Sequence, residues 1–95
     1  MFKRRKKPVF RLQIGQNPPI LLQELALPEE MILALSVKFF NDPEPCAIHR
    51  GAVRNRVLMQ LTALKDAPQP VSVDSLDAMY RALFAGETTI RIYEE

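Results

Sequence analysis

The segment LPEEMILALSVKFFND, residues 27–42, decides the fold because it is the most apolar stretch of the chain. Pro28 suits the first turn of a helix, since its missing N–H group needs no partner there. Glu29 and Glu30 follow at positions where the positive end of the helix dipole favours acidic side chains. The residues after them are apolar nearly all round a helix axis. This pattern predicts a helix that is largely buried.

A second interpretation of residues 31–40 stays open, because four apolar side chains also alternate with the period of a strand. These residues are Leu33, Leu35, Val37 and Phe39. A buried strand would satisfy the same alternation, whereas the acidic start of the segment is typical of a helix. We therefore expect a helix here and keep the strand as the alternative.

The two ends of the chain alternate more strictly and predict strands. In PVFRLQIG, residues 8–15, the apolar side chains at positions 10, 12 and 14 share one face. In ETTIRIYEE, residues 87–95, Ile90 and Ile92 share one face. Because a two-stranded ribbon is marginal on its own, we expect these strands to pair with each other beneath helices, or across the two-fold axis of a dimer.

Two further segments predict helices between the strands. GAVRNRVLMQLTALKDA, residues 51–67, has an apolar stripe at helical spacing. The stripe consists of Val53, Val57, Leu58, Leu61 and Leu64. DSLDAMYRALFAG, residues 74–86, predicts another helix, which Asp74 or Ser75 would cap and Gly86 would end.

Together these elements predict a small α+β domain in the order β-α-α-α-β. A length of 95 residues allows one domain. We assign residues 8–95 to this single domain and residues 1–7 to a basic flexible arm. A core of this size provides only a modest margin of stability, so association into a homodimer would help.

Positive charge is concentrated at the N-terminus. The first 16 residues hold six of the 13 lysines and arginines and no acid, so the remaining seven face 11 acidic residues. Five of the six are consecutive, namely Lys3, Arg4, Arg5, Lys6 and Lys7. This run is a candidate for contacts with nucleic-acid phosphates or another anionic surface. Its alternative role is that of a solubilising tail.

Arg50 and Arg54 form a second basic candidate. They are four residues apart and would share one face of a helix, whereas Arg56 would point elsewhere. Arginines near a helix N-terminus gain nothing from the dipole, so an anionic partner is a reasonable hypothesis. That partner would be a phosphate of a nucleic acid or another anion. The alternative is intramolecular pairing with the acidic body of the protein.

Residues that carry catalysis are scarce. Cys46 and His49 are the only residues of their kinds, and their spacing would place them on one helix face. No pair of acidic residues lies at ligand spacing beside them, so we expect no metal site. The three glycines lie far apart, which excludes a glycine-rich phosphate loop. We therefore expect no catalytic residue, no cofactor and no enzymatic activity.

Two functions fit these observations. The first is a non-enzymatic interaction module, such as an adaptor, regulator or assembly factor, that binds a protein partner or its own copy. The alternative is a nucleic-acid-binding protein that uses the basic arm and the face of Arg50 and Arg54. A single cysteine favours a reducing compartment, and no apolar run reaches the roughly 18–20 residues of a membrane span. We expect a cytoplasmic protein.

Overall fold

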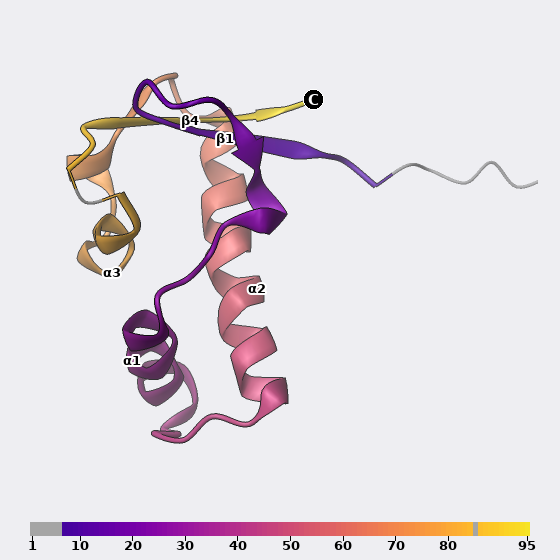
Figure 1. Cartoon of the computed structure of the whole chain (residues 1–95), viewed down its shortest axis with the longest axis vertical. Coiled ribbons are helices and arrows are strands. Elements are labelled where there is room, and N and C mark those ends of the chain that lie inside the picture. Colours follow the sequence, from indigo (N-terminus) through magenta and orange to yellow (C-terminus); the bar gives the residue numbers. More distant parts are fainter. Residues whose placement is uncertain (1–6, 85) are drawn as a thin grey trace, which may run out of the picture.

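The computed structural model describes residues 7–84 and 86–95. The elements follow in the order β1 (Phe10–Ile14), β2 (Ile20–Leu21), α1 (Glu29–Phe40), α2 (Ala47–Ala63), β3 (Val71–Ser72), α3 (Ala78–Arg81) and β4 (Thr89–Glu94). Single 3₁₀ turns lie between them at Leu22–Glu24, Leu64–Asp66, Val73–Ser75 and Ala82–Phe84. The result is a compact α+β domain with strands at both ends and helices between them, which confirms the expected fold class (Figure 1).

The terminal segments form the centre of an antiparallel sheet with the strand order β2-β1-β4-β3. β1 pairs with β4 along its whole length and places Leu12 opposite Ile92. Both side chains are 0% exposed, so the alternation seen in the sequence does mark the buried face. The expected pairing of the two terminal strands is confirmed, and two edge strands of two residues each, which were not expected, extend the sheet. Segments that short carry no periodic signal.

Gly15 follows β1 in a conformation that favours glycine. Its φ angle is +56°, and a Cβ atom there would collide with the Glu87 carboxylate. The backbone N–H of Gly15 donates to the carbonyl of Thr89 at 2.9 Å. The turn after β1 is therefore tied to the start of β4.

The segment that decides the fold is helical. α1 begins after Pro28 and ends at Asn41, which adopts a left-handed conformation with φ 52° and ψ 39°. Such a residue is a common helix stop, because its backbone leaves the helical path. The strand interpretation of residues 31–40 is therefore wrong.

The burial of α1 is one-sided. Met31 and Leu35 lie in the core at 8% and 3% exposure. Leu33 and Val37 lie on the outer side and are 36% and 46% exposed. The sequence predicted a helix buried on most sides, so this outer apolar face is a departure from the expectation.

α2 is the longest helix and runs from α1 to the sheet (Figure 1). It begins at Ala47, four residues before the expected start, because Cys46 takes the N-cap position directly after Pro45. The expected stripe faces the core, with Val53, Val57 and Leu61 fully buried. Its C-terminal half lies against the sheet, and its N-terminal half runs beside α1 (Figure 1). Within the described residues, no helix has both the length and the apolar character to cross a membrane.

The helix expected over residues 74–86 is only partly formed. α3 covers a single turn, and a 3₁₀ turn lies on either side of it. Neither Asp74 nor Ser75 caps it, because both belong to the preceding 3₁₀ turn, where the Ser75 hydroxyl donates to the carbonyl of Ser72 at 2.6 Å. Asp77 occupies the N-cap position instead.

Candidate functional site

The basic run is the first candidate from the sequence. Lys3, Arg4, Arg5 and Lys6 lie outside the described residues, as does most of the expected arm over residues 1–7. Lys7 is described and is exposed. A contact between this run and an anionic partner stays a prediction.

Arg50 lies in the first turn of α2 and pairs with Glu29 at the start of α1. Its Nη1 and Nη2 atoms donate to the two Glu29 carboxylate oxygens at 3.0 and 2.5 Å. The hydrogen bonds from Arg50 lower the pKa of Glu29, and those to Glu29 raise the pKa of Arg50. Both side chains are about half exposed, at 41% and 57%. The pair joins the N-terminal turns of two helices.

Arg54, one turn later, binds backbone rather than a carboxylate. Its Nη1 donates to the carbonyl of Leu25 at 2.6 Å, and its Nη2 donates to the carbonyl of Gln23. The two arginines do share a side of α2, as expected, and each has a partner within the protein. Arg50 pairs with an acidic side chain, as the intramolecular alternative expected, whereas Arg54 binds backbone carbonyls instead. A further contact with nucleic acid stays a prediction.

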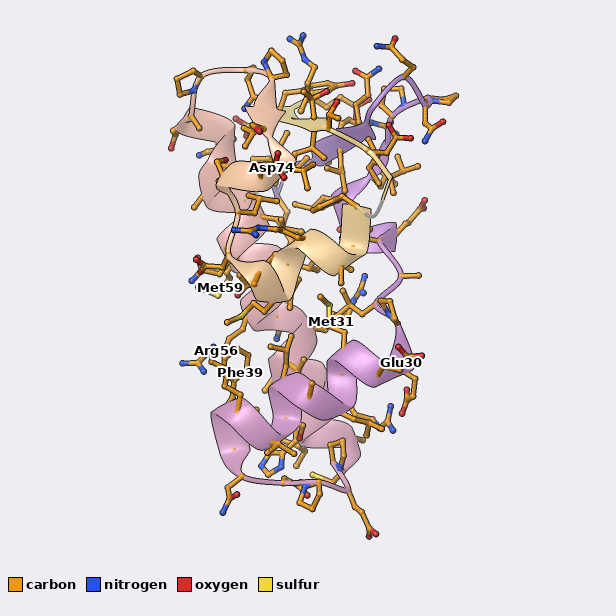
Figure 2. The ribbon with its side chains drawn as sticks, turned by 90° about the vertical axis from the view of Figure 1, so that its left-hand side faces the viewer. Glu30, Met31, Phe39, Arg56, Met59 and Asp74 are labelled. Carbon is orange, nitrogen blue, oxygen red and sulfur yellow. The ribbon has the colours of Figure 1, made fainter. Side chains whose placement is uncertain are left out.

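A largely apolar groove lies between α1 and α3. Its volume is about 360 Å³. The residues that line it are Pro28, Glu30, Met31, Ala34, Leu35, Ala78, Met79 and Ala82. Figure 2 shows the two helices one above the other, with Met31 directed into the space between them. Small alanines permit close approach of another backbone, and methionines adapt their shape to a partner. We call this feature the α1–α3 groove.

Two charged side chains of α1 lie at this groove: Glu30 lines it, and Lys38 lies just beyond its lining, near Met79. Glu30, Ala34 and Lys38 follow at intervals of four residues and therefore share one side of the helix. Glu30 and Lys38 lie about 12 Å apart along the axis, eight residues at the helical rise. Among the described residues neither forms an ion pair, and the Lys38 ammonium only approaches the Met79 sulfur at 4.0 Å.

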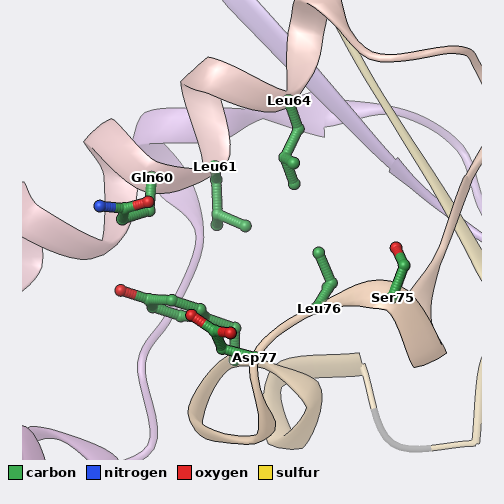
Figure 3. Close-up of a pocket in the computed structure, with 7 residues that line it drawn as sticks. Gln60, Leu61, Leu64, Ser75, Leu76 and Asp77 are labelled. Atoms are coloured by element: carbon green, nitrogen blue, oxygen red, sulfur yellow. The ribbon is translucent and has the colours of Figure 1, made fainter.

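A smaller cavity of about 170 Å³ separates the C-terminal half of α2 from α3 (Figure 3). Leu61, Leu64 and Leu76 form its apolar wall, and Gln60 and Asp77 lie at its polar side. Its volume is below the roughly 300 Å³ at which ligand pockets begin.

Tyr80 completes the lining of this small cavity. Burial, and then the nearby Asp77 carboxylate, raise the pKa of Tyr80, so the phenol stays protonated at neutral pH. A phenol held in this form acts as a hydrogen-bond donor and not as a general base.

The structure brings together three metal-binding side chains where α1 ends and α2 begins. One ligand atom each from Asp42, Cys46 and His49 lies within 4.8 Å of the others. His49 Nδ1 is 2.7 Å from Asp42 Oδ2, and the His49 ring stacks on Phe40 with 4.5 Å between centroids. The hydrogen bond from His49 lowers the pKa of Asp42, and the backbone N–H of Glu44 contributes in the same direction.

The sequence singled out two members of this cluster and missed the third. The sequence offers no pair of carboxylates beside Cys46 and His49, yet in the structure one carboxylate, that of Asp42, lies close to both. The signal was present as the spacing D-x₃-C-x₂-H. The spacing alone does not show that the three side chains meet. They meet because Asn41, in its left-handed conformation, turns the chain between α1 and α2.

No family model matches this chain, and comparisons with curated proteins and with solved structures give no significant match.

Proposed function

We propose that the protein is a small non-enzymatic interaction module and that the α1–α3 groove binds a second copy of the same chain. The observation that carries this proposal is an apolar groove beside the exposed side chains of Leu33 and Val37. Adjoining apolar surface with a charged rim is typical of protein interaction sites. A second α1 helix laid along the first at Ala34 would cover the edge of the groove on one flank and Val37 on the other.

The sequence of α1 suits a two-fold contact with itself. If two α1 helices cross antiparallel at Ala34, each residue four positions before Ala34 faces the residue four positions after it in the other copy. Glu30 of one copy then lies opposite Lys38 of the other, and the symmetry repeats the pair. A small residue at the crossing point lets the helices approach closely.

The charges at this contact favour the second copy over an unrelated apolar partner. Glu30 and Lys38 are exposed, and neither is paired with another described residue. The antiparallel arrangement gives both of them opposite charges without any change in the fold. A parallel arrangement would place like charges together and would be disfavoured.

The expected affinity is modest. α1 has 12 residues and is therefore about 18 Å long. Such a face is smaller than the roughly 800 Å² per partner of a standard interface. We expect a dimer that dissociates on dilution into the micromolar range.

Sedimentation velocity over a range of concentrations tests the proposal. The wild-type protein should shift from monomer to dimer as concentration rises. Lys38→Glu and Glu30→Lys should each favour the monomer, because each places two like charges opposite each other. The double variant E30K/K38E should restore the dimer, since the pairs are then only reversed.

A matched control is Asp74→Lys, an exposed charge reversal away from α1 (Figure 2). It changes the net charge as much as Glu30→Lys does, and it should leave the association unchanged. A wild-type protein that stays monomeric at all concentrations would overturn the proposal. Failure of the double variant to dimerise would overturn the antiparallel geometry.

Two further parts of this proposal come from the sequence. The protein works by binding and not by catalysis, because the sequence offers no complete catalytic constellation. A cytoplasmic location is part of the same proposal, and the single cysteine supports it.

A further inference from the structure

We propose that Asp42, Cys46 and His49 form a zinc-binding site with three protein ligands and one exchangeable position. The site lies at the junction of α1 and α2 and is independent of the proposed dimer contact. Carboxylate oxygen, thiolate sulfur and imidazole nitrogen are all donors that zinc accepts. Their combination is selective, because hard cations such as Mg²⁺ and Ca²⁺ bind oxygen ligands and not sulfur.

The distances require little movement. In a tetrahedral zinc site, bonds of about 2.0–2.3 Å place the ligand atoms about 3.3–3.6 Å apart. The three ligand atoms already lie within 4.8 Å of one another. The Asp42 oxygen and the His49 nitrogen are 2.7 Å apart, so they need to separate by roughly half an ångström to admit the ion.

The local backbone holds the three donors in place without the metal. The left-handed residue Asn41 turns the chain, and Pro43 and Pro45 restrict the loop that follows. Cys46 is the N-cap of α2, and His49 follows three residues later on the same side of the helix. The three donors therefore come from eight consecutive residues of fixed geometry.

Phe40 supports the orientation of one ligand. Its ring stacks on the imidazole of His49 with an interplanar angle of 5°. This contact limits rotation of the imidazole and keeps Nδ1 directed towards Asp42. A ligand that is oriented before the metal arrives loses less entropy when it binds.

The charges balance when zinc binds. When zinc binds, the Cys46 thiol releases its proton to solvent, and Nδ1 of His49 gives up the proton that it shares with the Asp42 carboxylate. The coordinated imidazole then carries a single proton, on Nε2. Two negative ligands then neutralise the divalent ion. The adjacent Arg50 is paired with Glu29, which compensates its charge.

The site is accessible to metal ions from solvent, because Cys46 is exposed; Asp42 and His49 are half-buried. A water molecule or a ligand from a partner can therefore occupy the fourth position. Such an open position is typical of zinc sites with three protein ligands.

Titration of the reduced full-length chain with Co²⁺, followed by displacement with Zn²⁺, tests the site. We expect one equivalent of Co²⁺ per chain, a thiolate-to-cobalt charge-transfer band, and the intense visible absorption of tetrahedral cobalt. Competition with Zn²⁺ should remove both bands. Zn²⁺ should also raise the thermal midpoint of the protein, because the ion should bind the folded junction more tightly than the unfolded chain.

Substitutions separate a built site from a single reactive thiol. We expect Co²⁺ binding to weaken more than about tenfold in each of three variants, Cys46→Ser, Asp42→Asn and His49→Gln. Loss of a residue that only supports a metal ligand already costs about tenfold, so loss of a ligand itself should cost more. Glu44→Gln is the matched control, because it neutralises an exposed carboxylate in the same loop and should leave the affinity unchanged. Circular dichroism of the metal-free variants establishes that each is folded.

Three results would overturn the site. Binding that is lost in Cys46→Ser but kept in Asp42→Asn and His49→Gln would indicate an isolated thiol. An octahedral cobalt spectrum without charge transfer would exclude the thiolate ligand. Half an equivalent of metal per chain would mean that two chains share the ion.

Discussion

Replacement of Arg54 with methionine tests whether the arginine side of α2 serves the fold. The guanidinium of Arg54 donates to the carbonyls of Leu25 and Gln23. Both acceptors lie in the connection between β2 and α1, so these bonds fasten that connection to the middle of α2. Methionine keeps most of the aliphatic stem and its packing, but it removes both donors.

The expected effect follows from the number and exposure of these bonds. A hydrogen bond that involves a charged group contributes about 1.5–3 kcal/mol to stability. The bond to Leu25 is partly buried, whereas the bond to Gln23 is exposed and contributes less. We expect Arg54→Met to lower the free energy of unfolding by about 2–3 kcal/mol. That is a large part of the about 5–15 kcal/mol available to a domain.

Urea denaturation at neutral pH measures this loss. Arg50→Met is the matched control, because it removes the same charge from the same helix but breaks only an exposed pair with Glu29. We expect its effect to be clearly smaller than that of Arg54→Met. A loss below about 0.5 kcal/mol for Arg54→Met, the range of ordinary surface substitutions, would refute the structural role.

The same two variants bear on the nucleic-acid hypothesis. If either arginine also contacts phosphate, its replacement should reduce the salt dependence of duplex DNA binding by about 0.9 in the logarithmic slope. If both serve only the fold, the slope should stay that of the wild-type protein. Any remaining affinity would then depend on the run from Lys3 to Lys7.

Three other predictions concern α1. Leu35→Ala should lower the free energy of unfolding by about 2–5 kcal/mol, since Leu35 is 3% exposed; a near-neutral value in urea denaturation would contradict its place in the core. Ser36→Ala should raise stability by about 1 kcal/mol, because its buried hydroxyl has no hydrogen-bond partner among the described residues; a lower thermal midpoint would show that the hydroxyl is satisfied. Glu29→Gln should reduce stability at neutral pH. Arg50 holds the pKa of Glu29 below its ordinary value of 4.5, so the wild-type advantage should disappear as pH falls through that lowered pKa. An advantage that persists in acidic urea titrations would contradict the pair.

The sequence predicted the elements whose side chains repeat over several turns or along a whole strand. β1, β4 and α2 each present a continuous apolar face, and burial of Leu12, Val57 and Ile92 follows directly from that period. The third helix was too long in the prediction because its apolar spacing continues across Leu76. The chain instead places a 3₁₀ turn on either side of α3, and in such turns side chains three residues apart lie on the same side.

The candidate sites depend on contacts between elements, so the sequence predicted them less well. The partners of Arg54 are backbone carbonyls about thirty residues away, and a carbonyl leaves no trace in residue type. The approach of Asp42 to Cys46 and His49 depends on one left-handed residue between two helices. The groove is lined by residues of α1 and α3, which lie far apart in the sequence, so no local pattern predicts it.

The departure of α1 from its prediction is itself an argument for the dimer. Apolar residues nearly all round a helix predict burial on all sides, yet Leu33 and Val37 remain exposed in the single chain. A surface helix needs polar residues on its outer face, and beyond Glu29, which pairs with Arg50, the exposed polar residues of α1 are Glu30 and Lys38. Those two charges lie at equal distances on either side of Ala34, which is the condition for pairing across a two-fold axis. The exposed apolar side chains and the symmetric placement of Glu30 and Lys38 have no role in the monomer. An antiparallel pair of α1 helices would use both.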